Sequence, residues 1–198
     1  MIVIGLTGNL ASGKSEAARL FKKLGAKVFD ADRAAKNAAR RGTPIYKAIV
    51  KIFGAEYLDK NRQLDRKKLA WHVFSHPKEL KKLDVLIHPG VIFESFKMIE
   101  RTRDQKGVLV LDVPLLFESK MENLTDFTVV VGAQRSTLLA RAKKKGLPEN
   151  LAKKILSTQW PFKRKVRLAD FVIENNGTFR DLEKKVREIF EKIKSTKD

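Results

Sequence analysis

The sequence predicts a three-layer α/β domain built around a parallel β-sheet. Short apolar runs alternate along the chain with segments of helical pattern. These runs are continuously apolar, which is typical of parallel strands covered by helices on both faces. Because such sheets bind ligands at the carboxyl ends of their strands, polar residues at those ends are the first candidates for a functional site.

The first part of the chain predicts a strand–helix–strand unit. Residues 2–7 form a short β-branched run that glycine ends, and residues 15–24 follow as a helix that stops at Gly25. Residues 26–32, AKVFDAD, are predicted to be a second strand that ends in two acids. A unit of this kind makes the two strands parallel.

The stretch 33–105 has a different character and predicts an inserted helical sub-domain that binds the substrate. It is rich in lysine and contains no strong strand pattern. Proline and glycine punctuate it at Pro44, Gly54, Pro77 and Pro89.

The remaining elements return to the α/β pattern. Strands are expected at 107–113, at 126–132 and within 170–177, and helices at 136–145 and 148–159. The last helix begins at Thr178, where Thr178 and Asp181 fit a capping box with aspartate in place of glutamate. Four residues are expected to gather at the carboxyl edge of the sheet: Thr7, Asp32, Asp112 and Asn175.

Composition limits the class of protein. The 198 residues contain no cysteine, which excludes disulfides, cysteine-ligated zinc and a thiol nucleophile, and fits a reducing cytoplasm. No apolar run approaches the roughly 18 residues that span a bilayer, and residues 1–7 do not resemble a signal peptide. We therefore expect a cytoplasmic protein without a membrane partner.

The net charge of +19 raises nucleic-acid binding as an alternative function. The basic residues are spread along the chain, however, and no RNA-binding aromatic motif or zinc knuckle is visible. A basic surface also suits an enzyme with polyanionic substrates. Nucleic acid is therefore not the expected partner.

The turn after the first strand carries the strongest motif. Residues 8–15, GNLASGKS, fit the pattern G-x-x-x-x-G-K-[ST] between a strand and a helix, which is a phosphate-binding P-loop. In such a loop the backbone N–H groups surround the phosphates, Lys14 reaches the β- and γ-phosphates, and the hydroxyl of Ser15 ligates Mg²⁺. A nucleoside triphosphate and Mg²⁺ are thus the expected ligands of this loop. The residues expected to contact the nucleotide are Gly8, Asn9, Leu10, Ala11, Ser12, Gly13, Lys14, Ser15 and Glu16.

The rest of the chain favours a small-molecule kinase among the P-loop enzymes. Residues 129–136 lack the guanine-reading N-K-x-D of a GTPase. Asp30 and Asp32, two apart on the predicted strand, point the same way, and Asp32 lies further past the strand end. Asp32 is suited to accept a proton from an acceptor hydroxyl and to help hold Mg²⁺. The structural alternative for Asp32 is an ion pair with a surface lysine, and Asp30 either shares the site or caps the next helix.

Several segments together resemble the dephospho-coenzyme A kinase family over nearly the whole chain. They are GLTGNLASGKS (5–15), LGAKVFDAD (24–32), LDRKKLAWHVF (64–74), His88-Pro89, LDVPLLFE (111–118), RAKKKG (141–146), Gln159 and ADFVIENNG (169–177). The resemblance implies a nucleotide-binding core, a helical coenzyme A-binding domain and a lid, here at about 134–165. It also implies that ATP and Mg²⁺ are used to phosphorylate the ribose 3′-hydroxyl of dephospho-coenzyme A, the last step of coenzyme A biosynthesis. Asp32 is then the general base, and Arg141 the lid arginine that stabilises the transferred group.

The chain departs from the family in four places. Asn9 and Ala11 stand where the family usually has glycine, Glu16 where threonine is usual, and Lys145 where a second arginine is common. A lysine neutralises charge but does not grip a phosphate with two parallel hydrogen bonds.

Most of the remaining candidates have a structural alternative. His88 and Pro89, with Leu115 and Phe117, either line the acceptor site or serve the structure and the core. Asp112 ends an apolar strand, where an acid can hold Mg²⁺ through water. Asn175 either approaches the adenine of ATP or simply forms a turn, and the turn is favoured.

The rival enzyme is a nucleoside or nucleotide kinase, which performs the same chemistry on a different acceptor.

Overall fold

The computed structural model describes residues 1–196, and these form two compact units. The first unit combines Met1–Asp30 with the chain from Ser95 onward, and the second is Ala31–Glu94. Among the described residues, no helix has the length and apolarity that crossing a bilayer requires.

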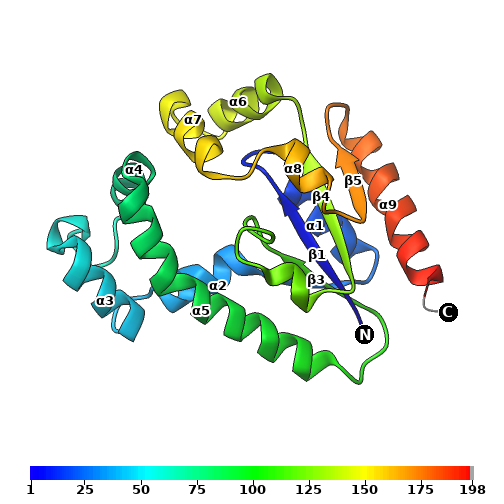
Figure 1. Cartoon of the computed structure of the whole chain (residues 1–198), viewed down its shortest axis with the longest axis horizontal. Helices are drawn as coiled ribbons and strands as arrows, with labels where there is room; N and C mark the ends of the chain where they lie inside the picture. The colour runs from blue at the N-terminus through cyan, green and yellow to red at the C-terminus, as the bar shows by residue number, and fades with distance from the viewer. Residues whose placement is uncertain (197–198) are drawn as a thin grey trace. The chain divides into compact units, whose positions relative to one another are not determined.

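A five-stranded sheet forms the centre of the first unit (Figure 1). Its strands are β1 (Ile2–Gly8), β2 (Lys27–Asp30), β3 (Val108–Asp112), β4 (Phe127–Gly132) and β5 (Phe171–Glu174). Their order is β2-β3-β1-β4-β5, and every neighbouring pair is parallel. The predicted parallel orientation of the first two strands is confirmed, with β3 lying between them.

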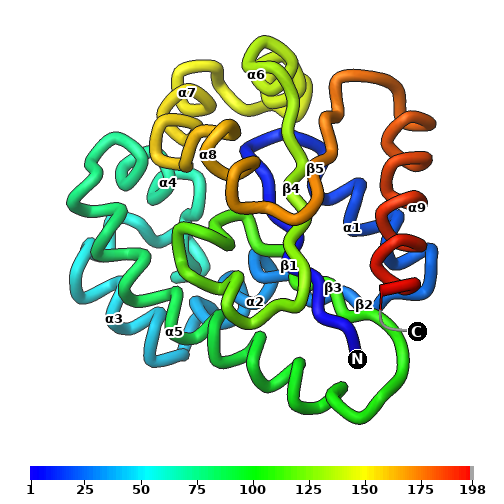
Figure 2. The backbone as a smooth tube through the Cα atoms, turned by 45° about the vertical axis from the view of Figure 1, so that its right-hand side comes forward, coloured from blue at the N-terminus to red at the C-terminus, as the bar shows by residue number. Residues whose placement is uncertain are grey.

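Helices α1 (Lys14–Lys23) and α9 (Phe179–Ser195) pack side by side against one face of the sheet (Figure 2). The core between these helices and the sheet is built from alternate residues of the strands and from the apolar faces of both helices. Its most deeply buried members are Ile4, Leu6, Ala17, Phe21, Val110, Val129, Val131, Ile173, Val186 and Ile193. Burial on both faces explains why the strands are apolar throughout.

The opposite face carries shorter segments. Leu116 packs on Gly5 of β1, and Phe162 packs on Gly132 of β4. These contacts come from the segment after β3, which includes the short helix η2 (Met121–Leu124), and from α8 (Phe162–Val166). Two further helices, α6 (Arg135–Lys144) and α7 (Glu149–Thr158), contact each other. The predicted α/β class with helices on both sides of a parallel sheet is confirmed.

The second unit is helical. It contains α2 (Ala31–Ala38), α3 (Pro44–Phe53), η1 (Ala55–Tyr57), α4 (Arg66–Ser75) and most of α5 (Pro77–Thr102). Its core consists of Ala39, Ile49, Phe53, Leu69 and Val73. Pro44 and Pro77 each begin a helix, where the missing N–H costs nothing. Pro89 does not end one, because α5 continues through it for 26 residues in all.

The predicted second strand was too long. β2 ends at Asp30, and Ala31 already begins α2, so Asp32 lies in the first turn of a helix and not on a strand. The expectation that Asp30 and Asp32 share a strand face is therefore wrong. An acid in the first turn is favourable because it meets the positive end of the helix dipole, and the following alanines favour helix.

The capping box of α9 is confirmed. The Thr178 hydroxyl accepts a hydrogen bond from the backbone N–H of Asp181 at 3.3 Å, and Asp181 Oδ2 accepts from the backbone N–H of Thr178 at 2.7 Å. The bond from the Thr178 backbone, with a second from its hydroxyl, lowers the pKa of Asp181 below its ordinary value.

We expect Asp181 to stabilise the protein only while its carboxylate is ionised. Since the folded-state pKa is lowered, the stabilisation is present above the unfolded-state pKa of about 4 and is lost as the pH falls through the folded value. The wild type should therefore melt above Asp181→Asn at neutral pH, and the difference should shrink in acid. Thermal unfolding followed by circular dichroism at both pH values checks this. Glu191→Gln, an exposed position in the same helix, is the control. An unchanged difference in acid would contradict the assignment.

Candidate active site

The loop between β1 and α1 has the geometry of the predicted P-loop. A side chain at Gly8 would meet the carbonyl oxygen of Val131 at 2.3 Å, so glycine is needed there for close packing. Gly13 has φ of +98° and lies against the Asn175 amide, so glycine is needed for both conformation and space. The loop leads directly into the N-terminus of α1, whose first N–H groups have no partner within the helix and favour anions.

Ala11 takes a left-handed conformation in this loop, with φ of +58°. This conformation costs an alanine roughly 1–2 kcal/mol. It is the position where the family resemblance predicts glycine, so alanine takes this conformation at an energetic cost.

Ala11→Gly is expected to raise the free energy of unfolding by about 0.5–1 kcal/mol, after the larger chain entropy of glycine is allowed for. Ala140→Gly is the matched control, because Ala140 is exposed within α6. There glycine should lower the free energy of unfolding by about 1 kcal/mol. Urea titration of both variants tests the opposite signs. A loss of stability in Ala11→Gly would show that Ala11 is unstrained.

Lys14 and Asp112 come together at the carboxyl edge of the sheet. β3 runs beside β1, with Asp112 in register with Leu6. Lys14 Nζ donates a hydrogen bond to Asp112 Oδ1, and only 10% and 9% of these side chains are exposed. The residue expected to bind phosphates and one expected to hold the metal thus form a nearly buried ion pair.

Ser15 and Glu16 follow in the first turn of α1. Ser15 is exposed. Glu16 Oε1 pairs with Arg19 Nη2 at 2.8 Å, one helical turn further along. This ion pair offsets the charge of the glutamate beside the loop.

Arg141 and Asn175 hold the backbone of the P-loop through hydrogen bonds. Asn175 is 7% exposed, and its amide donates to the carbonyl oxygen of Ser12 at 2.8 Å. Arg141, on α6, donates from Nη1 to the carbonyl oxygen of Asn175 at 2.9 Å and to that of Ser12 at 3.5 Å. The guanidinium expected in the lid therefore lies beside the P-loop.

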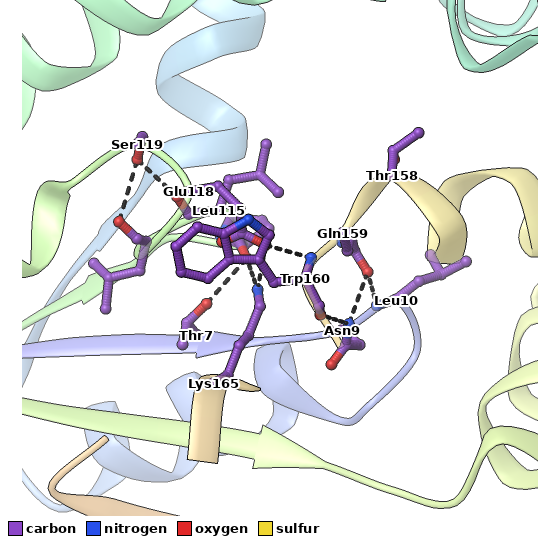
Figure 3. Close-up of polar contacts among 12 residues, drawn as sticks. Thr7, Asn9, Leu10, Leu115, Glu118, Ser119, Thr158, Gln159, Trp160 and Lys165 are labelled. Carbon is purple, nitrogen blue, oxygen red and sulfur yellow. Dashed lines mark hydrogen bonds and ion pairs between the residues drawn. The ribbon is translucent and has the colours of Figure 1, made fainter. Parts of the chain in front are cut away.

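The segment after β3 carries Leu115, Phe117 and Glu118. Leu115 is half-buried, and Phe117 is only 3% exposed. Glu118 Oε1 pairs with Lys165 Nζ of α8 at 2.9 Å (Figure 3). Burial lowers the pKa of Lys165; Glu118 opposes this shift, and the charge of Lys14 adds to it.

Thr7, at the end of β1, is fully buried, and its hydroxyl donates to the carbonyl oxygen of Pro114 at 3.0 Å. Asp30, the last residue of β2, is in register with Asp112. The remaining predicted residues, Asp32, His88 and Pro89, belong to the second unit. There Asp32 is exposed, and His88 Nε2 lies 3.5 Å from Asp84 Oδ1 within α5.

Lys165 is a polar residue near the site that sequence reasoning missed. It stands in the run KRK in a lysine-rich region, and nothing in that pattern marks one lysine as buried. A fully buried lysine is rare because its charge must be paired. Only the fold, which brings Glu118 opposite it, identifies it.

The side chains at the loop fit a magnesium ion. Mg²⁺ is usually held by one or two protein oxygens, with water and substrate phosphates completing its shell. The Ser15 hydroxyl and the Asp112 carboxylate are oxygen donors of this kind. A set of one hydroxyl and one carboxylate suits a metal that arrives with a phosphate ligand.

Known proteins resemble this chain over nearly its whole length. The model of the dephospho-CoA kinase family matches residues 2–181. The dephospho-CoA kinase of Bacillus cereus is 40% identical over 182 residues, which are 91% of each chain. Among solved structures, TT1252 from Thermus thermophilus has a TM-score of 0.77 at 33% identity, covering 97% of both chains. Dephospho-CoA kinase from Campylobacter jejuni has a TM-score of 0.71 at 25% identity, covering 99% of this chain and 98% of the other.

Proposed function

Since the chain belongs to the dephospho-CoA kinase family, we propose that it transfers the γ-phosphoryl group of ATP to the ribose 3′-hydroxyl of dephospho-coenzyme A. The products are coenzyme A and ADP, and the reaction is the last step of coenzyme A biosynthesis. The observation that supports the phosphate chemistry most strongly is the ion pair of Lys14 and Asp112 at the mouth of a P-loop. In the proposed reaction the Lys14 ammonium of this pair binds phosphate, and the Asp112 carboxylate binds the metal.

The loop residues 8–16 bind the triphosphate. Their backbone N–H groups and the N-terminus of α1 receive the phosphate oxygens. Lys14 then shares its charge between Asp112 and the β- and γ-phosphates. Asn175, through Ser12, holds the loop in shape. Mg²⁺, when bound through Ser15, Asp112 and Asp32, would neutralise phosphate charge and orient the leaving group.

Asp32 is the general base of the proposed reaction. Its carboxylate takes the proton of the 3′-hydroxyl as the new O–P bond forms, while the bond between the γ-phosphorus and the bridging oxygen breaks and ADP leaves. Arg141 stabilises the charge of the transferred group. Thr7, His88, Pro89, Leu115 and Phe117 are proposed to bind the acceptor.

ADP release with a panel of acceptors tests this function. With ATP and Mg²⁺ present, we expect turnover with dephospho-coenzyme A and little with AMP, CMP or adenosine. Turnover with AMP or CMP and not with dephospho-coenzyme A would identify a nucleotide kinase instead. No turnover with any acceptor would contradict the proposal.

A further inference from the structure

The most deeply buried cation of the first unit is Lys165, whose side chain has no exposed surface. Its ammonium is 2.9 Å from Glu118 Oε1 and donates to the carbonyl oxygen of Pro114 at 3.0 Å. Removing two charges from water is costly, and a buried pair often stabilises a fold less than apolar residues of the same size would. The presence of this buried ion pair beside a phosphate site therefore calls for a reason other than stability.

Hydrogen bonds lead from this ion pair to the P-loop. Glu118 Oε1 also accepts from the backbone N–H of Trp160 at 2.9 Å. The carbonyl oxygen of Trp160 accepts from Asn9 Nδ2 at 3.1 Å. Gln159 Oε1 accepts from the backbone N–H of Leu10 at 2.9 Å and from Asn9 Nδ2 at 3.4 Å (Figure 3).

The other end of the same network returns to β1. The Pro114 carbonyl oxygen that Lys165 binds also accepts from the Thr7 hydroxyl. The network thus reaches the chain on both sides of Gly8, at Thr7 and at Asn9. In the first turn of the loop, Leu10 in addition packs against the apolar cluster of Ala133, Leu138 and Leu156.

Charge favours a geometric role for the pair. Lys165 is close enough to Lys14 for their charges to repel, but Glu118 compensates its positive charge. The pair therefore adds little to the attraction for phosphate. Two acceptors of the network, Asn9 Oδ1 and Glu118 Oε2, are buried without a hydrogen-bond partner within the described residues. Such unsatisfied atoms are few in native proteins, and each calls for an explanation such as a functional role or a bound water.

We propose that Glu118 and Lys165 are positioning residues for the nucleotide. Their ion pair holds the connection 159–161 between α7 and α8, and this connection fixes the P-loop through Asn9 and Leu10. Asn9, where the resembled family usually has glycine, supplies the side chain that makes the link. The inference rests on the proposed function, because it assumes that the loop binds ATP and ADP.

Binding of ADP, measured by titration calorimetry without any acceptor, tests the proposal. In the double variant Glu118→Leu/Lys165→Met no buried charge is left unpaired and no side-chain oxygen remains at 118 for Trp160, and we expect the Kd for ADP to rise at least about tenfold while cooperative unfolding is kept. The matched control is Glu149→Gln/Lys153→Met, which removes an exposed ion pair of α7, and it should leave the Kd unchanged. A Kd within about twofold of the wild type in the first double variant would overturn the proposal.

A second comparison tests whether the ion pair acts on the P-loop through Gln159. Gln159→Leu should raise the Kd by itself, and adding it to the double variant should raise it little further, because both changes act on the same link. If Gln159→Leu raises the Kd by the same factor in the double variant as in the wild type, the proposed route through Gln159 is overturned. If that double variant does not fold, Glu118→Gln/Lys165→Met and Glu118→Ala/Lys165→Met decide, since neither leaves a buried charge unpaired and only glutamine keeps an oxygen for Trp160. Alanine should weaken ADP binding more than glutamine, and equal binding by both would overturn the proposal.

The wild type separates this inference from the proposed function. A wild-type protein that binds no ADP would refute the proposed function itself, and the inference with it. A protein that binds ADP but does not phosphorylate dephospho-coenzyme A would refute the proposed function alone.

Discussion

Lys14→Met is expected to lower kcat/KM for ATP by about 10²–10³-fold or more, because it removes the cation that we propose binds the transferred phosphate. In the structure this ammonium is nearly buried and is directed at the carboxyl edge of the sheet by its bond to Asp112. No other lysine extends from the loop itself. Steady-state kinetics with dephospho-coenzyme A as the acceptor measure the effect.

Two further variants separate charge from folding. Lys14→Met removes a positive charge next to the nearly buried Asp112 carboxylate, which is destabilising, so folding is checked by circular dichroism. Lys14→Arg keeps the charge but changes its geometry, and it should also lose most of the activity. Lys22→Met, at an exposed position of α1, should behave as the wild type. Near-normal rates in a folded Lys14→Met would contradict the role given to this residue.

Asp32→Asn is expected to reduce kcat by about 10²–10⁴-fold, the usual contribution of a general base. Asparagine has nearly the same shape but does not take up the proton of the acceptor hydroxyl. Because Asp32 is exposed in the first turn of α2, the exchange should change stability little. ADP release with saturating ATP and dephospho-coenzyme A measures kcat, and calorimetry shows whether ADP still binds.

Asp30→Asn identifies which of the two acids acts. Asp30 is the last residue of β2, two positions before Asp32. A large loss in Asp32→Asn with a smaller one in Asp30→Asn supports Asp32 as the base, whereas the reverse order would transfer the role to Asp30. Asp104→Asn, an exposed carboxylate between α5 and β3, serves as the control for removing a negative charge.

The strands and the loop were predictable because their signals are local. Continuous apolar runs marked β1, β3 and β4 to within two residues, since each is buried on both faces. Gly8 and Gly13 marked the P-loop because the backbone there excludes other side chains. The place of Asp112 at the carboxyl edge of the sheet followed from a general property of parallel sheets, whose carboxyl ends share one edge.

Other features depend on contacts between distant parts of the chain. The strand order, with β3 between β1 and β2, is not written in any single segment. The end of β2 at Asp30 reflects a competition between strand and helix over AKVFDAD, which the sequence does not resolve. Lys165 became recognisable as a buried residue only when Glu118 was found opposite it. The left-handed backbone of Ala11 is imposed by the loop, against the preference of alanine.

The most direct test of the account is the structure of the reaction product. The purified protein is incubated with ATP, Mg²⁺ and dephospho-coenzyme A, and the product is isolated and examined by phosphorus NMR and mass spectrometry. The account predicts a single new phosphomonoester on the ribose 3′-oxygen, formed in equal amount to ADP. A phosphate on another atom, or ADP released without a phosphorylated acceptor, would contradict it.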